Sequence, residues 1–284
     1  MNQTDVTINS TQRPVTIIRP THGWSALNLS DLWAHREMLY FLIWSDLKLR
    51  YKQTSLGAVW AVLQPLMTMI VYSIFLGRLA RVPSDGIPYP LFVYTALVPW
   101  TYFSNALSSS SLSLLRYERV ITKVYFPRLI VPLSAVAAGL VDLGITFVLL
   151  VGIVFYYGLM PGLAIVLLPL FVLLATVTAL AVSLWLSALN VQYRDVRYTV
   201  PFLTQVWMFI TPVIYPSSLV PERWHLLYGL NPMAGVVEGF RWTLLGQDNP
   251  SVPILLASSS MTLLILVGGL YYFRRMERTF ADVV

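Results

Sequence analysis

The sequence predicts an all-α integral membrane protein with six transmembrane helices, an N-terminal amphipathic interface helix and re-entrant outer helices before the last span. Of its 284 residues, 57% are hydrophobic and only 11% are charged. Soluble domains carry about 25% charged residues, so these few charges cannot cover a soluble globule. The mean hydropathy of +0.68 agrees with this class, and the absence of cysteine excludes a disulfide scaffold.

The gaps between charged residues place the spans, because a helix needs about 20 apolar residues to cross a bilayer and charge is costly inside it. Uncharged stretches of 25, 30 and 24 residues hold the first, second and fifth spans. The third and fourth form a hairpin whose only charge is Asp142. The predicted spans lie near residues 56–76, 91–112, 129–157, 163–190, 198–215 and 252–273.

The positive charges predict the orientation, since Lys and Arg are enriched on cytoplasmic flanks. With both termini cytoplasmic, fifteen of the nineteen fall inside, and the four outside are Arg78, Arg81, Arg223 and Arg241. This topology also explains the net charge of +6, so no nucleic acid is expected as a partner. We divide the chain into a polar tail expected to be disordered (1–30), the interface helix (31–54), the transmembrane domain (55–276) and a cytoplasmic C-terminus (277–284).

Residues 31–54 have apolar side chains at helical spacing after a plausible N-cap at Ser30. Asp46 and Arg50 have the four-residue spacing of a helix ion pair. We interpret the segment as a helix lying in the membrane interface, either as a simple topology anchor or as an element that a cytoplasmic partner moves. Its aromatic anchors are Trp33, Tyr40, Trp44 and Tyr51.

Two further segments are neither loops nor spans. Residues 116–128 combine four cations with aromatic residues, which favours a short helix that contacts something in the cytoplasm, although topology alone also explains the cations. Residues 233–245 are too apolar for a solvated loop and too short to span, which is typical of a re-entrant or interfacial helix. There, Glu238 and Arg241 lie three residues apart and are expected to form a structural pair.

The groups that an enzyme needs are missing from the sequence. The three histidines are scattered, no Walker-type phosphate loop is present, and no metal site is expected. Asp142 is the one acid deep within a span, and an intramembrane charge is a functional hypothesis by default. With no obvious partner in the membrane, it is interpreted either as a proton relay or as a hydrogen bond between packed helices.

Aromatic residues are abundant, with nine Trp, sixteen Tyr and thirteen Phe. Many belong to interfacial belts, but some lie within spans one and five. Rings with a polar tip suit the mixed C–H and hydroxyl surface of sugars, while lipid contact and helix packing explain any single ring better. The candidates for a sugar-contacting track are Trp60, Tyr72, Phe75, Phe202, Trp207, Phe209 and Tyr215.

Three blocks carry a family resemblance that runs from about residue 31 to the C-terminus. Residues 46–66, DLKLRYKQTSLGAVWAVLQPL, resemble the entry to the first span in the membrane subunits of ABC-2 type polysaccharide exporters, which serve O-antigen, capsule and teichoic acid. Residues 231–246, NPMAGVVEGFRWTLLG, are similar to the block before their last span. Residues 125–128, YFPR, resemble the end of their loop between spans two and three.

The resemblance implies a homodimeric permease of the bacterial inner membrane that works with two copies of a separate ATP-binding subunit. ATP and Mg would be used by that partner, and this chain would bind no cofactor. The cargo would be an undecaprenyl-diphosphate-linked polysaccharide, with O-antigen as the first choice. Alternatives are an ABC-2 permease for drugs or lipids, an integral membrane glycan-modifying enzyme, which would need clustered acids, and a channel or structural protein.

The resemblance also assigns candidate sites. The interface helix would sit in a cleft of the ATPase, and spans one and five would line the conduit. The coupling candidates are Trp44, Asp46, Lys48, Arg116, Glu118, Arg119 and Lys123. Cations beside a glycine turn at a helix start suit a phosphate group, because free backbone N–H groups point at it. The resemblance implies that the lipid diphosphate meets the turn at Leu56 and Gly57, and with the neighbouring cations the candidates are Arg50, Lys52, Leu56 and Gly57.

Overall fold

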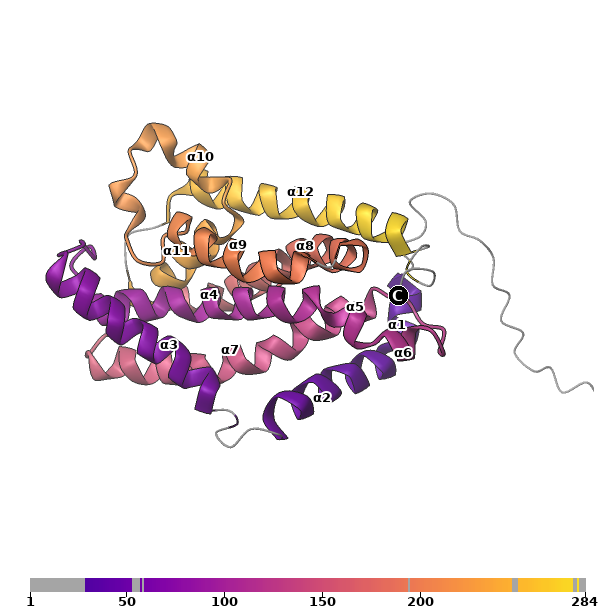
Figure 1. Ribbon diagram of the computed structural model, residues 1–284. Helices are drawn as coiled ribbons and strands as arrows, with labels where there is room; N and C mark the ends of the chain where they lie inside the picture. The colour runs from indigo at the N-terminus through magenta and orange to yellow at the C-terminus, as the bar shows by residue number, and fades with distance from the viewer. Residues whose placement is uncertain are drawn as a thin grey trace, which may run out of the picture.

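The computed structural model describes residues 29–52, 57, 59–193, 195–246, 250–277 and 280, and every regular element in that part of the chain is helical. The predicted tail lies outside the described residues except for its last two. Figure 1 shows an elongated bundle of long helices that run roughly side by side. These are α2 (Arg36–Lys52), α3 (Val59–Tyr72), α4 (Tyr89–Ser111), α7 (Ile130–Tyr156), α8 (Leu168–Gln192), α9 (Val196–Ile210) and α12 (Val252–Glu277).

Short helices lie at the two ends of the bundle (Figure 1). At one end are α1 (Leu29–Ala34), α5 (Ser113–Arg116) and α6 (Glu118–Ile121). At the other end are α10 (His225–Gly229) and α11 (Pro232–Leu245), preceded by the single turns η4 (Ser217–Leu219) and η5 (Glu222–Trp224). A π-helix, η2 (Ser73–Leu79), extends α3, and a 3₁₀ turn, η3 (Leu163–Leu167), leads into α8.

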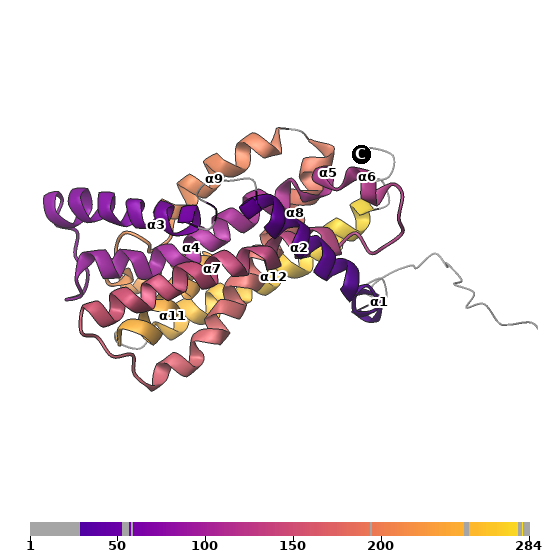
Figure 2. The ribbon, with the colours of Figure 1, turned by 90° about the horizontal axis from the view of Figure 1, so that it is seen from below.

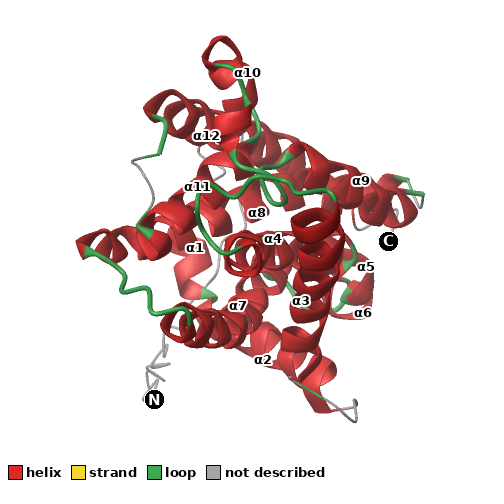
Figure 3. Cartoon of the chain, turned by 90° about the vertical axis from the view of Figure 1, so that its left-hand side faces the viewer, coloured by secondary structure: helices red, strands yellow, loops and turns green. Residues whose placement is uncertain are grey.

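Helix α4 is the centre of the bundle. Seventeen of its twenty-three residues are buried, and it packs against α3, α7, α8, α9 and α11. Viewed from the end that carries α10 and α11, the other helices surround it (Figure 3). A helix that is apolar on all sides must be covered on all sides, which explains its central position.

A second apolar cluster ties together the end that carries α1, α5 and α6. Leu42 of α2 packs there with Tyr117, Ile121 and Phe273. The backbone N–H of Arg128 donates to the Glu277 carboxylate at 3.1 Å, and the Arg128 guanidinium donates to the Glu277 carbonyl. The last turn of α12 is therefore fastened to the segment that follows α6.

The all-α class is confirmed for the described residues, and the long helices coincide with the predicted spans. Four of them are long and apolar enough to cross a membrane: Val59–Leu79, Ile130–Tyr156, Leu163–Gln192 and Val252–Glu277. Helices α4 and α9 complete the predicted six, a number that stays a prediction. Helix α9 ends five residues before the predicted boundary, because the chain turns extended at Thr211, just before Pro212.

Helix α11 forms where a re-entrant or interfacial helix is predicted. Asn231 caps it by accepting a hydrogen bond from the Met233 backbone N–H at 3.1 Å, and Pro232 occupies the first turn. Gly246 ends it in the left-handed conformation, with φ of 65°. Thirteen of its fourteen residues are buried. It packs against α4, α8 and α12, so this apolar segment is covered by protein.

The close packing of α11 against α8 gives a testable prediction. A Cβ added to Gly239 would lie 2.1 Å from the buried ring of Phe171, whereas one added to Gly144 of α7 meets nothing within 4 Å. We expect Gly239→Ala to destabilise the detergent-solubilised protein by about 1–3 kcal/mol, since overpacking forces the ring to shift. Gly144→Ala is the matched control and should leave the melting temperature unchanged or slightly raised. Equal melting temperatures for the two variants would contradict the packing.

Candidate functional site

Helix α2 contacts the bundle along one face and leaves the other uncovered. Only Leu42 and Asp46 are buried in it. The chain breaks at His35 between α1 and α2, so the predicted interface helix is two helices. Figures 1 and 2 show α2 running obliquely along α7, with its last turn directed toward the middle of the bundle. That this segment lies in the membrane interface stays a prediction.

The first polar contact of α2 is a buried carboxylate, Asp46, which is 4% exposed. Its Oδ1 accepts hydrogen bonds from Arg116 Nη1 at 3.1 Å and from the Tyr117 hydroxyl at 2.8 Å. Burial raises the pKa of Tyr117 to about 12, so this hydroxyl remains a neutral donor at physiological pH. We name these three residues the Asp46 clamp; they join α2 to the α5–α6 segment.

The second polar contact involves Asp142 in the middle of α7, which is 8% exposed. Arg50 Nη1 donates to one carboxylate oxygen, and the Tyr51 hydroxyl donates to the other. Arg50 Nη2 also donates to Ser109 Oγ of α4 at 3.2 Å. We name Asp142, Arg50 and Tyr51 the Asp142 clamp; with Ser109 it joins α2 to α7 and α4.

The depth of the Asp142 clamp follows from helix geometry. Asp142 is twelve residues beyond Ile130, the first residue of α7. At 1.5 Å per residue it lies about 18 Å along that helix. Arg50 and Tyr51 therefore reach well into the bundle. Burial and the hydrogen bond to Asp142 raise the pKa of Tyr51 above its ordinary value, so it too remains a donor.

These contacts correct two sequence expectations. The Asp46–Arg50 helix ion pair was wrong, because each side chain pairs with a distant partner. Asp142 has a charged partner, although none was evident within the spans, because the cation comes from α2. Tyr51, Tyr117 and Ser109 were missed as polar partners. An Arg-Tyr dipeptide occurs at 50–51 and 116–117, but it also occurs at 197–198, where Tyr198 is exposed, so the dipeptide alone does not single out the two tyrosines.

The other coupling candidates lie on the surface at this end. Trp44 is 49% exposed, and Lys48 Nζ lies 5.3 Å from the centroid of its ring. In the α5–α6 segment, the apolar residues Tyr117 and Ile121 face the core. The charged candidates Arg116, Glu118, Arg119 and Lys123 are exposed. The structure therefore separates Asp46, which is buried, from the candidates that are accessible to a partner.

The lipid-diphosphate candidates occupy the connection between α2 and α3. Lys52 is exposed at the end of α2, and Gly57 has a left-handed φ of 45° two residues before α3 begins. Leu56 lies outside the described residues. The Gly57 carbonyl accepts from the Trp60 N–H at 3.3 Å, so the glycine forms the start of the α3 turn.

Helices α3 and α9 flank α4 and are the least covered of the predicted spans. Within the most apolar stretch of Val59–Leu79, which α3 and η2 form, only 6% of the residues are buried. In α9, the buried residues are Val200 and Thr204. The exposed track candidates are Trp60, Phe75, Phe202 and Phe209. The others are engaged: the Tyr72 hydroxyl donates to Met208 Sδ at 3.9 Å, and the Tyr215 hydroxyl donates to the Ile210 carbonyl at 3.2 Å.

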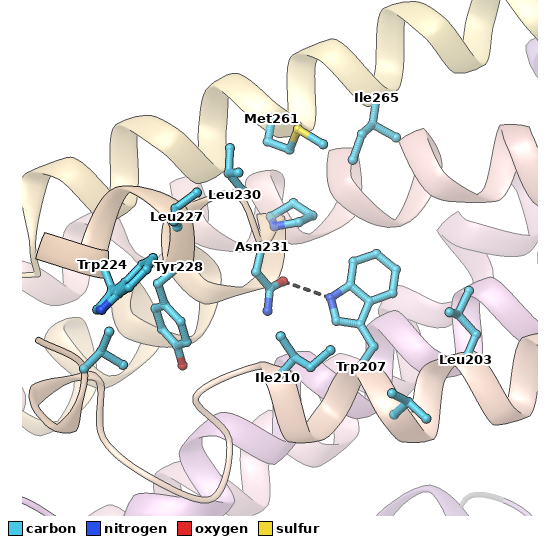
Figure 4. Close-up of a pocket in the computed structure, with 13 residues that line it drawn as sticks. Leu203, Trp207, Ile210, Trp224, Leu227, Tyr228, Leu230, Asn231, Met261 and Ile265 are labelled. Atoms are coloured by element: carbon cyan, nitrogen blue, oxygen red, sulfur yellow. Dashed lines mark hydrogen bonds between the residues drawn. The ribbon is translucent and has the colours of Figure 1, made fainter.

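Trp207 points away from this uncovered surface into a pocket of about 670 Å³ between α9, α10 and α12. Figure 4 shows its ring directed toward Asn231, whose Oδ1 accepts from the indole Nε1 at 2.9 Å. Trp224 and Tyr228 line the opposite wall of the pocket. Trp207 also stacks edge-on against Phe103 of α4. Its side chain therefore braces α9 against α4 and α11.

At the end that carries α10 and α11, Glu238 and Arg241 are both buried in α11, but no ion pair joins them among the described residues. Arg241 instead donates to the carbonyls of Val213 at 2.9 Å and Phe92 at 3.4 Å, and its guanidinium lies 3.5 Å from the Phe92 ring centroid. The expected direct pair is thus replaced by a cation held by carbonyls and a ring.

A central helix enclosed by apolar spans, with a partly uncovered helix clamped along one side, defines a multi-pass membrane protein. Residues 37–245 match the ABC-2 type transporter family. This match covers well over half of the chain, and the chain belongs to that family.

The relatives include transport permeases of nearly the same length. The chain is 29% identical over 257 residues to the O-antigen export system permease protein RfbA of Myxococcus xanthus, covering 89% of this chain and 98% of the relative. It is 29% identical over 250 residues to the protein of that name from Klebsiella pneumoniae, covering 87% and 95%. The inner membrane transport permease YadH of Escherichia coli K12 is 24% identical over 270 residues, covering 90% and 96%.

The Asp46 clamp gives a second prediction. Asp46→Ala and Tyr117→Phe should each lower thermal stability, and the double variant should lose less than the sum, with a coupling of about 0.5–3 kcal/mol. The reason is that the first change already removes the acceptor that the hydroxyl needs. Glu118→Gln, an exposed neighbour, is the control and should behave as wild type. Strictly additive effects in thermal unfolding would rule out the contact.

Proposed function

We propose that this protein is the membrane-spanning permease subunit of an ABC transporter that exports undecaprenyl-diphosphate-linked polysaccharide across the bacterial inner membrane. O-antigen is the first choice of cargo. Two copies of the chain form the permease, and two copies of a separate ATP-binding subunit drive it. All six predicted helices span the membrane, α10 and α11 form the outer re-entrant region, and both termini are cytoplasmic.

The observation that carries this proposal is the similarity to O-antigen export permeases over almost their whole length. Relatives that align from end to end share an architecture, and the helices described above follow the order that the resemblance requires. The cargo class rests on those relatives together with the exposed aromatic side chains of α3 and α9.

The uncovered face of α2 supports an ATPase partner. Trp33, Tyr40, Phe41 and Trp44 are all exposed. Aromatic side chains next to cations are enriched at the centres of protein interfaces. The exposed charges of the α5–α6 segment lie at the same end of the bundle (Figure 1). We assign Trp44, Lys48, Arg116, Glu118, Arg119 and Lys123 to this interface, and the buried Asp46 to the clamp beneath it.

The surface of α3 and α9 supports a second copy of the chain. A glycan needs a path that excludes lipid, and a single bundle filled by α4 offers none. Pairing two copies across α3 and α9 would cover these helices and leave a conduit lined by Trp60, Phe75, Phe202 and Phe209. Rings in such a conduit contact sugars weakly and allow them to slide.

The runner-up is an ABC-2 permease for drugs or lipids. It shares the dimer and the ATPase but has no need of an aromatic track. This alternative is supported by the similarity to YadH, which is 24% identical and is named only as a transport permease. A Phe202→Ala, Phe209→Ala variant distinguishes the two. Loss of glycan export, with the ATPase activity of the assembled transporter unchanged, would favour the polysaccharide permease.

The ATPase interface gives the third prediction. Trp44→Ala with Lys48→Ala should weaken association with the ATPase about tenfold, since interface tryptophans are frequent hot spots. Association is measured by co-purification in mild detergent, and function by hydrolysis stimulated with lipid-linked glycan. Arg223→Ala with Trp224→Ala removes the matching cation–ring pair at the other end of the bundle and is the control. Undiminished association of the Trp44, Lys48 variant would contradict the assignment.

The topology gives the fourth prediction, and the cysteine-free sequence makes it easy to measure. A single cysteine at the exposed position Pro83 should react with a membrane-impermeant maleimide added to intact spheroplasts. One at the exposed position Lys123 should react only after the membrane is opened. The expectation follows from the excess of Lys and Arg on the cytoplasmic side. The reverse labelling pattern would invert the proposed orientation.

A further inference from the structure

Three hydrogen-bond donors from two helices converge at the Asp142 clamp. The Arg50 guanidinium and the Tyr51 hydroxyl come from the last turn of α2, and both donate to Asp142. Ser109 of α4 accepts from Arg50, and no described residue accepts the proton of its own hydroxyl. A cation and a hydroxyl that donate to one carboxylate, with a second hydroxyl beside the cation, are the groups that an anion site needs.

The donors and the carboxylate differ in accessibility. Arg50, Tyr51 and Ser109 are each partly exposed, whereas Asp142 is buried behind them. An anion that approaches from the protein surface thus meets the donors before it meets Asp142. Lys52 and the turn at Gly57 follow directly along the chain. This places the site at the connection through which α2 enters the first predicted span.

The Arg50 guanidinium is only partly exposed, so a charge-assisted hydrogen bond to an anion is favourable at this position. A carboxylate carries one negative charge and two acceptor oxygens, and both oxygens of Asp142 are engaged. A diphosphate carries more charge and more acceptor oxygens. It can satisfy Arg50, Tyr51 and Ser109 together, which the side chain of Asp142 does not do.

We propose that Asp142 is an internal competitor at the lipid-diphosphate site: its carboxylate and the diphosphate group of the lipid-linked cargo compete for the donors Arg50, Tyr51 and Ser109. This inference rests on the proposed function. In the structure Asp142 holds the place of the ligand. The arriving diphosphate takes over the donors, and the contact that fastens the last turn of α2 to α7 is exchanged for a contact with cargo.

The exchange has a mechanical consequence. The Asp46 clamp does not involve Arg50 or Asp142, so it keeps α2 joined to the α5–α6 segment while the Asp142 clamp opens. Cargo binding would free the end of α2 that faces the middle of the bundle. It would leave intact the end that faces the ATPase. Asp142 therefore acts as a positioning residue: it holds the end of α2 when no cargo is bound and releases it when cargo binds.

The test measures binding of undecaprenyl diphosphate to the full chain in nanodiscs of phosphatidylethanolamine and phosphatidylglycerol. Asp142→Asn keeps the shape and the hydrogen-bond acceptor but removes the competing charge. We expect it to bind roughly tenfold more tightly than wild type, because the diphosphate no longer has to displace a charged acceptor from the donors. One charged hydrogen bond corresponds to a change of this size. Arg50→Gln should bind at least about tenfold more weakly for the same reason. Asp142→Ser serves as a second variant if Asp142→Asn does not fold.

Asp46→Asn is the matched control, because it removes the carboxylate of the other Arg-Tyr clamp on the same helix and should leave the affinity unchanged. Inorganic pyrophosphate, tested alone, separates the headgroup from the lipid chain. It should bind more weakly overall and still show tightening by Asp142→Asn. Tightening for the lipid but not for pyrophosphate would contradict recognition of the diphosphate by these donors.

The remaining outcomes separate the inference from the function. Equal or weaker binding by Asp142→Asn, together with loss of binding by Arg50→Gln, would overturn the competition and leave the proposed lipid site standing. Unchanged binding by Arg50→Gln would remove Arg50 from the site and overturn the inference. Absence of binding to wild type and to all variants would contradict the proposed lipid-linked cargo itself.

Discussion

The pairing of Asp142 with Arg50 and Tyr51 is the interaction on which the arrangement of α2 depends. Asp142 lies among apolar helices, where an unpaired carboxylate would have to lose its charge or its place. The described residues of α7 and α8 contain no cation, and the partner of Asp142 comes from α2. This pairing holds the end of α2 about 18 Å along α7.

The Asp46 clamp uses the same chemistry with the roles of the helices exchanged. There α2 supplies the carboxylate, and the α5–α6 segment supplies Arg116 and Tyr117. Both clamps lie in the second half of α2, which leaves its first half and its exposed aromatic face available to a partner. Arg128 and Glu277 form a second, separate polar contact at this end, beside the same apolar cluster. A force applied to that face would reach the middle of α7 through side-chain contacts already in place.

The sequence predicted the positions of the helices but missed the contacts between residues that lie far apart in the chain. Spans are found because apolar length is a property of contiguous residues, so the predicted boundaries and the observed helices differ by few residues. The clamp partners are separated by 70 and 92 positions, and helical spacing wrongly favoured the nearer Asp46–Arg50 pair. Trp207 shows the same limit at the candidate conduit: its place in α9 was evident, but its direction, toward Asn231, depends on how α9 packs.

The two ends of the bundle hold their buried charges in different ways, and this difference indicates where movement is possible. Arg241, at the end that carries α10 and α11, is held by two backbone carbonyls and a ring, and a backbone carbonyl cannot rotate away as a side chain can. Arg50 is held by a side-chain carboxylate and a hydroxyl, and both can turn away when a stronger anion arrives. Gly239 packed against Phe171 adds rigidity to the outer end. Exchangeable contacts thus gather at the end that carries α2, α5 and α6, where an ATPase would act.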